Sequence, residues 1–192
     1  MQREPQNNSK DQQRVFGVFF IAISISVAVA AIISEIAFLN ELPLYYHTII
    51  WIGSFAITFV SLFYNKYNVM HFLENRMKKS IRWPTNAKVV NGVCWAGPFA
   101  AIAVLPSYFP YLILVGIGLG NLSTYLLLKG YNRINSQEQL IIGLISLVAI
   151  PITFEVHTSL FIVRGDIAIM LSRILISFAY AAGGIYAMKT RK

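Results

Sequence analysis

Six apolar runs, each long enough to cross a lipid bilayer, constrain the fold of this chain more than any other feature. A spanning helix needs about 20 predominantly apolar residues, with a range of about 17–25. The runs cover residues of about 15–38, 44–64, 89–105, 110–129, 140–157 and 167–188. The first run also resembles a secretory signal, with cations before it and small residues at positions 28 and 30. Its apolar character continues to Phe38, beyond the roughly 7–15 residues of a signal core, so we favour an uncleaved helix.

The composition agrees with a membrane protein. Of the 192 residues, 56% are hydrophobic and 12% are charged, whereas a soluble domain has about 25% charged residues. We therefore predict an all-α integral membrane protein. In this prediction residues 15–192 form a single six-helix membrane domain, and the polar residues 1–14 form a disordered tail.

A dense basic segment, residues 65–88, separates the second run from the third. Lys and Arg resist translocation and are attracted to the anionic inner leaflet, so this segment is expected in the cytoplasm. The other connections alternate in agreement, because those expected outside hold zero, zero and one Lys or Arg, whereas those expected inside hold three, six, two and three. We therefore predict a multi-pass protein of the cell membrane with both termini in the cytoplasm.

The same basic segment contains a predicted amphipathic helix at residues of about 69–83. Apolar residues recur there at helical spacing, and cations occupy the other side, as in helices that lie in the headgroup plane. The bilayer is one expected partner, through its anionic inner leaflet, and a cytoplasmic protein is a second. The net charge of +8 does not indicate nucleic-acid binding, because the cations cluster in the connections expected in the cytoplasm, as the positive-inside rule predicts. The candidate docking residues are Lys66, Arg76, Lys78, Lys79 and Arg82.

Arg173 is the most conspicuous polar residue inside a predicted span, about 9 Å along its helix from the outer boundary. An intramembrane arginine is costly unless it is paired, hydrated or able to reach the interface. Three interpretations stay open. Arg173 could bind an anionic group in an outward-facing cavity, form a structural ion pair with Glu155 or Glu35, or extend its side chain to the interface.

The other polar candidates lie in the same predicted outer layer, namely Glu35, Glu155, His47, His157 and Asp166. Imidazole and carboxylate groups can bind metal ions, but HExxH is absent and no other spacing supports a metal site. No cofactor is expected. Neither GxSxG nor a phosphate-binding loop occurs, and Cys94 lies in an apolar run, so an enzyme is the less favoured interpretation.

Small residues predict close contacts between the spans. Gly116 and Gly120 form a GxxxG pair, and Gly183 and Gly184 lie in a run of small residues. Pro98 is expected to kink the third run, which is the most polar of the six. Four intramembrane polar residues are expected to hydrogen-bond between helices: Asn91, Asn121, Ser123 and Thr124.

These features predict a small transport-related membrane protein with an outward-facing polar site around Arg173. The alternative is a non-catalytic subunit or assembly factor that docks a cytoplasmic partner through residues 65–88. No motif identifies a family. In architecture alone, six helices in fewer than 200 residues with a basic inner face resemble small transport subunits, such as the substrate-binding membrane components of vitamin importers.

Overall fold

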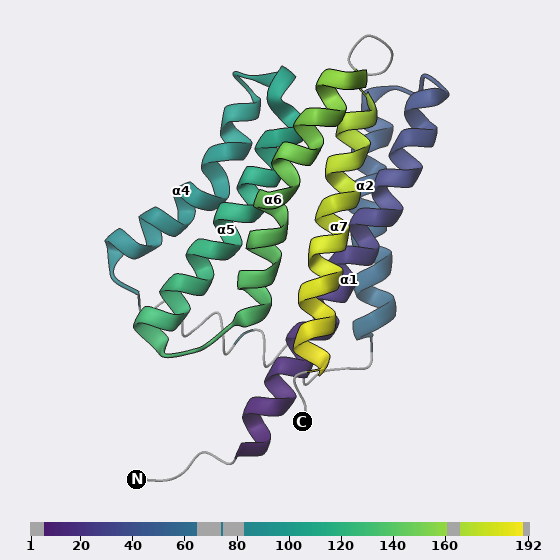
Figure 1. Cartoon of the computed structure of the whole chain (residues 1–192). Coiled ribbons are helices and arrows are strands. Elements are labelled where there is room, and N and C mark those ends of the chain that lie inside the picture. The colour runs from purple at the N-terminus through teal and green to yellow at the C-terminus, as the bar shows by residue number, and fades with distance from the viewer. Residues whose placement is uncertain (1–5, 65–73, 75–82, 161–165, 190–192) are drawn as a thin grey trace.

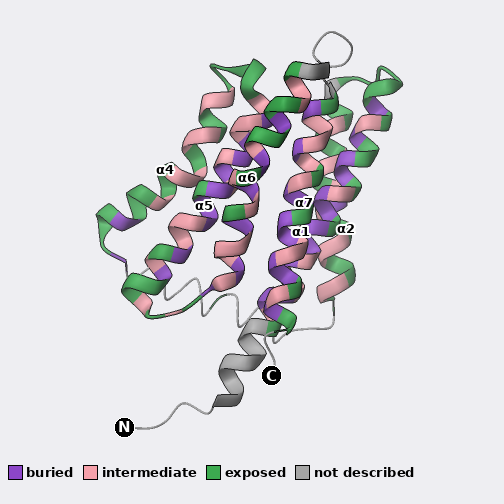
Figure 2. Cartoon of the chain, viewed as in Figure 1, coloured by how far each residue is buried: buried purple, intermediate pink, exposed green. Residues whose placement is uncertain are grey.

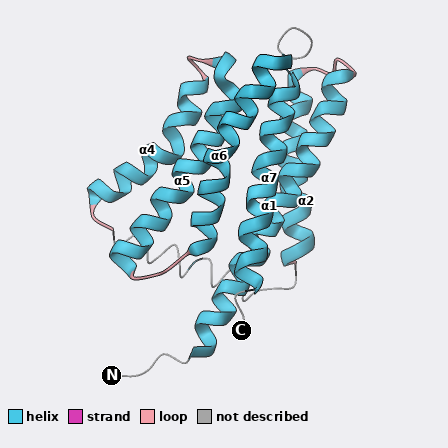
Figure 3. Cartoon of the chain, viewed as in Figure 1, coloured by secondary structure: helices cyan, strands magenta, loops and turns pink. Residues whose placement is uncertain are grey.

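The computed structural model describes residues 6–64, 74, 83–160 and 166–189, and this part of the chain is almost entirely helical (Figure 3). Its elements are the helices α1 (Gln6–Leu39), α2 (Leu44–Phe63), α4 (Thr85–Ile102), α5 (Phe109–Asn132), α6 (Gln137–Leu160) and α7 (Asp166–Lys189), with the short 3-10 helix η1 (Pro106–Tyr108) before α5. The all-helical class is therefore confirmed for the described residues. The predicted amphipathic helix at about 69–83, with Lys66, Arg76, Lys78, Lys79 and Arg82, lies almost wholly outside them.

Five of these helices are long and apolar enough to cross a membrane. Their candidate spans are Arg14–Leu39, Tyr45–Phe63, Pro106–Asn132, Gln137–Thr158 and Ile167–Lys189. The chain is thus a helical multi-pass membrane protein. The third predicted run forms α4, which begins at Thr85, carries Lys88 and Asn91 in its first two turns, and is not among these five candidate spans.

Consecutive helices run in opposite directions (Figure 1). As a result α1 begins and α7 ends at one end of the bundle, called here the inner end, and the opposite end is called the outer end. Along the bundle α1 packs on α7, α7 on α6, α6 on α5, and α5 also touches α7. The remaining two helices lie at the flanks, α2 chiefly against α1 and α4 chiefly against α5.

Glycines permit the closest of these helix contacts. A Cβ atom added to Gly184 of α7 would lie 2.9 Å from the carbonyl oxygen of Gly17 in α1, and one added to Gly183 would lie 2.9 Å from the carbonyl oxygen of Glu138 in α6. Between α1 and α7, Ser177 Oγ also donates a hydrogen bond of 2.9 Å to the Ser24 carbonyl oxygen. Small residues let backbones approach in lipid, where no hydrophobic force drives helices together.

Polar residues join α4 to α5, as the sequence predicted. Asn91 Oδ1 accepts hydrogen bonds from Ser123 Oγ at 2.8 Å and from Thr124 Oγ1 at 3.0 Å. Each of these groups would be costly to leave unpaired in hydrocarbon. The polar side chain of Asn91 therefore helps to hold α4 to the bundle.

The boundary of the first helix differs from the prediction. A disordered tail is expected over residues 1–14, but α1 already begins at Gln6. Once the apolar run has formed a helix, each further residue adds a hydrogen bond without a new nucleation step. Gln, Lys and Arg, which occur in residues 6–14, are favourable helix residues.

Buried residues face the centre of the bundle, whereas exposed apolar residues cover the outer sides of α2 and α4 (Figure 2). The main core joins α1, α5, α6 and α7 and includes Phe20, Leu114, Ile142 and Tyr180. A second, smaller core lies at the inner end around Trp83, Ala87 and Leu128. Exposed side chains such as Ile52 and Ile57 of α2 suit contact with lipid.

Candidate functional site

A cavity of about 590 Å³ lies at the centre of the bundle and is partly open to the outside. Ligand sites usually measure about 300–1,000 Å³ and combine apolar walls with a few polar groups. All six long helices contribute to this cavity. Its lining consists of Phe19, Phe20, Ile23, Val27, Trp51, Phe55, Trp95, Phe99, Phe109, Ile113, Ile117, Asn121, Gln139, Arg173, Ile176 and Tyr180.

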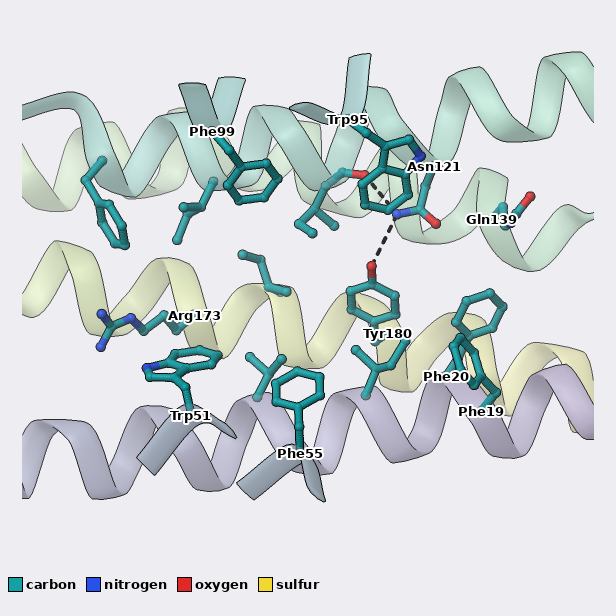
Figure 4. A pocket seen from close by; sticks show the side chains of 16 residues that line it. Phe19, Phe20, Trp51, Phe55, Trp95, Phe99, Asn121, Gln139, Arg173 and Tyr180 are labelled. Carbon is teal, nitrogen blue, oxygen red and sulfur yellow. Dashed lines mark hydrogen bonds between the residues drawn. The ribbon is translucent and has the colours of Figure 1, made fainter. Parts of the chain in front are cut away.

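Aromatic rings from the two flanking helices face each other across this cavity. Figure 4 shows Trp51 and Phe55 of α2 on one side, Trp95 and Phe99 of α4 on the other, and α7 between them. Each pair is four residues apart, so both rings project from one helix face. Trp51 and Phe55 stack with ring centroids 6.3 Å apart.

The predicted glycine pair of α5 makes room for the α4 rings. A Cβ atom added to Gly116 would lie 2.8 Å from the Phe99 ring, and one added to Gly120 would lie 2.4 Å from the Trp95 ring. The Trp95 indole also donates a hydrogen bond of 3.1 Å to Thr124 Oγ1. Gly116 and Gly120 therefore set the shape of one cavity wall.

Arg173 lies at the outer end of the cavity, and its side chain extends toward the beginning of α7 (Figure 4). The guanidinium carbon is 5.4 Å from the centroid of the Trp51 ring and 5.7 Å from that of Phe109. Both distances are within the roughly 6 Å of a cation–π contact. Two rings from different helices thus hold the cation in place.

Among the described carboxylates, the charge of Glu35 acts on Arg173 and stabilises the cation. It is half-buried near the outer end of α1, whereas Glu155 is exposed near the outer end of α6. Of the two acids that the sequence offered as partners, the structure thus brings Glu35 into the electrostatic environment of Arg173. A guanidinium has five N–H donors, so one carboxylate does not exhaust its binding capacity.

The opposite end of the cavity contains neutral polar groups. Asn121 is 2% exposed, and its Nδ2 donates to the Ile117 carbonyl oxygen at 2.9 Å and to the Tyr180 hydroxyl at 3.5 Å. Gln139 lies near them, and its buried Oε1 accepts no hydrogen bond from the described residues. The cavity is therefore cationic at the outer end, aromatic along its walls and uncharged at its inner end.

The remaining candidates of the predicted outer layer lie apart from this cavity. His157 Nδ1 pairs with the Tyr111 hydroxyl, which joins α6 to α5, and both residues line a second cavity of about 520 Å³. His47 is half-buried in the first turn of α2, and Asp166 is the first residue of α7. Among the described residues no three His, Cys, Asp or Glu side chains are grouped to hold a metal ion.

Sequence reasoning missed the aromatic walls, which are the largest part of the site. The signal was present, because aromatic residues recur at every fourth position of α2, at 51, 55, 59 and 63, and again at 95 and 99 of α4. Aromatic residues at the ends of spans are typical of the membrane interfaces, and that interpretation leaves out those that lie between the ends.

Comparisons of this chain with protein-family models, with curated proteins and with solved structures found no match.

Proposed function

We propose that this protein is transport-related, either a transporter or the membrane subunit of one, and that it binds its ligand in the central cavity at Arg173. The observation that carries this proposal is the position of Arg173 at the outer end of a cavity lined by all six long helices. A solid bundle would favour a purely structural role, because it leaves no space for a ligand. Polar or ionisable residues inside membrane spans commonly mark substrate pathways.

The proposal includes six spans, with α4 crossing the bilayer as well, and with both termini in the cytoplasm. Charge at the two ends of the bundle supports this orientation. By the bounds of the helices, Arg14, Lys88, Lys129, Arg133 and Lys189 lie toward the inner end, whereas Glu35, Glu41 and Glu155 lie toward the outer end. Because positive residues remain inside, the inner end is placed in the cytoplasm. In this orientation, the end of the cavity that contains Arg173 lies toward the external side of the membrane.

A second function, docking of a cytoplasmic protein, is supported by Trp83. Trp83 is 6% exposed in the small inner core, and its Nε1 donates a hydrogen bond of 2.5 Å to Asn132 Oδ1 of α5. This contact holds Trp83 at the inner end of the bundle, and Trp83 directly follows residues 65–82, the first part of the basic segment. The basic residues would then present their charge to the inner leaflet or to an acidic partner.

The transport proposal is tested by the small molecules that remain bound after purification in a mild detergent. Mass spectrometry of the extracted ligand is expected to show an anionic compound in the wild type. The amount should fall at least tenfold in Arg173→Met and recover in part in Arg173→Lys, which keeps the charge. Arg14→Met removes an exposed arginine and is the control. Equal ligand content in all four proteins would disprove binding at Arg173.

A further inference from the structure

We infer that the cavity ligand is a single-chain amphipathic anion that reaches the site from the bilayer. This inference rests on the proposed function and names the chemical class of its ligand. The ligand has a carboxylate or phosphate head at Arg173 and a hydrocarbon chain along the aromatic walls. Three observations carry it: the single cation at one end, the apolar lining, and the placement of α2 and α4.

The head is assigned by the geometry around Arg173. Its guanidinium lies over the rings of Trp51 and Phe109, so the two aromatic faces hold it, and its N–H groups make no hydrogen bond to another described residue and can bind an anion at their edge. Arginine binds carboxylate and phosphate groups through two parallel hydrogen bonds. The half-buried Glu35 supplies one negative charge nearby, and the five donors of a guanidinium accommodate a second anion.

The chain is assigned by the lining and length of the cavity. Apart from Arg173, Asn121, Gln139 and the Tyr180 hydroxyl, the lining side chains are hydrocarbon or aromatic. At 1.5 Å per residue, the seven residues from Arg173 to Tyr180 span about 10 Å, and the twelve from Phe109 to Asn121 span about 18 Å. The chains of one membrane leaflet fill about half of a 30 Å hydrocarbon core, a length of about 15 Å. One acyl chain therefore matches the cavity.

The route is assigned by the two flanking helices. α2 and α4 do not pack substantially against each other. The main contacts of α2 are with α1, and those of α4 are with α5. The partly open cavity lies between their aromatic rings (Figure 4). The outer sides of both helices are apolar, with Ile57 70% and Val93 63% exposed, and Phe99 is itself 41% exposed. An opening bordered in this way faces hydrocarbon, and a membrane-dissolved chain can enter it without crossing water.

Tryptophan fluorescence tests the inference directly, because Trp51 and Trp95 line the cavity and Trp83 does not. The full chain is placed in nanodiscs of unbrominated lipid and titrated with stearate brominated at mid-chain, with the matching alkyl phosphate, and with the methyl ester of the same acid. Bromine quenches indole fluorescence on contact. The two anions should quench saturably at concentrations at least tenfold lower than the uncharged ester.

Two pairs of variants separate the head from the chain. Arg173→Met should abolish the preference for the anions, and Arg14→Met should keep it. Ile117→Phe, which fills the cavity, should raise the half-saturating concentration of brominated stearate at least fivefold. Leu119→Phe, on the exposed side of the same helix, should leave it unchanged. Thermal unfolding of each variant establishes that it is folded, and Arg173→Gln, which also removes the charge, replaces Arg173→Met if the latter is not.

The failures are distinguishable. Equal quenching by stearate and its methyl ester would overturn the anionic head, and no effect of Ile117→Phe would overturn the place of the chain. If inorganic phosphate competes with brominated stearate at millimolar concentration, the ligand is a small water-soluble anion. In that case the inferred class is wrong but the proposed function stands. Absence of saturable quenching, together with equal ligand content in the wild type and Arg173→Met, would disprove both.

Discussion

At the scale of single residues, Arg173 is recognisable from the sequence as a charge inside a membrane span, but its role depends on the residues around it. Its cost in hydrocarbon, about 2.5–3.5 kcal/mol on insertion scales, makes the residue conspicuous in the sequence. The choice between a cavity, an ion pair and an extended side chain depends on neighbours from other helices. Those neighbours are Trp51 and Phe109, more than 60 residues away in the chain, and Glu35 of α1.

Replacing Glu35 tests which acid acts on Arg173. Glu35→Gln removes a negative charge that competes with an anionic ligand, so affinity for brominated stearate should rise roughly two- to fivefold, from about 0.5–1 kcal/mol of charge interaction. Glu155→Gln is the matched control and should leave the affinity unchanged, because Glu155 is exposed on α6. The quenching titration measures both variants. A gain in affinity in Glu155→Gln and not in Glu35→Gln would show that the acid acting on Arg173 is Glu155 of α6, which contradicts our assignment.

Gly184 offers a residue-scale test of helix packing. A Cβ atom there would lie 2.9 Å from the Gly17 carbonyl oxygen, and backbone cannot move aside as a side chain can. Gly184→Ala should therefore lower the free energy of unfolding by about 1–3 kcal/mol, the usual cost of overpacking. Gly53→Ala, whose Cβ would meet nothing within 4 Å, is the control and should be neutral or stabilising. Denaturant unfolding in detergent provides the comparison, and equal losses in both variants would contradict the close contact of α1 and α7.

At the scale of elements, hydropathy predicted most helices well and one incompletely. The runs that form α1, α2, α5, α6 and α7 each contain a candidate span. α4 is different, because the hydrogen bonds of Asn91 to Ser123 and Thr124 contribute to holding this helix in the bundle. That polar residues would bond between helices was predictable. Which helix would accept them depended on tertiary contacts.

The contact between α4 and α5 predicts the effect of replacing Asn91. Asn91→Leu leaves the hydroxyls of Ser123 and Thr124 without their shared acceptor, although both also bond the Gly120 carbonyl oxygen. The free energy of unfolding should fall by about 0.5–2 kcal/mol, the range of interhelical hydrogen bonds in membranes. Asn86→Leu, on an exposed position of the first turn of α4, is the control. An equal loss of unfolding free energy in Asn86→Leu would show that the general polarity of α4, and not the contact of Asn91 with Ser123 and Thr124, determines stability.

At the scale of the whole molecule, the alternation of charge between connections predicts an orientation with both termini in the cytoplasm. The central cavity was not predictable, because it arises between helices distant in the chain. The outer layer of histidines and acids was expected to form one site. Two parts of it are separate in the structure: Arg173, on which the charge of Glu35 acts, and a contact between His157 and Tyr111.

Cysteine labelling tests the six-span topology and the crossing of α4 in particular. In a Cys94→Ser background, Glu41→Cys and Ser107→Cys should react with a membrane-impermeant maleimide in intact cells, because both lie in outer connections. Asn135→Cys, in the exposed connection between α5 and α6, should react only after permeabilisation. If Glu41→Cys is labelled outside and Ser107→Cys only inside, then α4 does not cross the membrane.

The most direct test of a ligand site at Arg173 is the dissociation constant of brominated stearate, compared between Arg173→Met and Arg14→Met. Loss of hydrogen bonds to a charged group costs about 1.5–3 kcal/mol. We therefore predict an affinity roughly ten- to a hundredfold weaker in Arg173→Met and an unchanged affinity in Arg14→Met. Equal dissociation constants in the two folded variants would contradict a binding site built around Arg173.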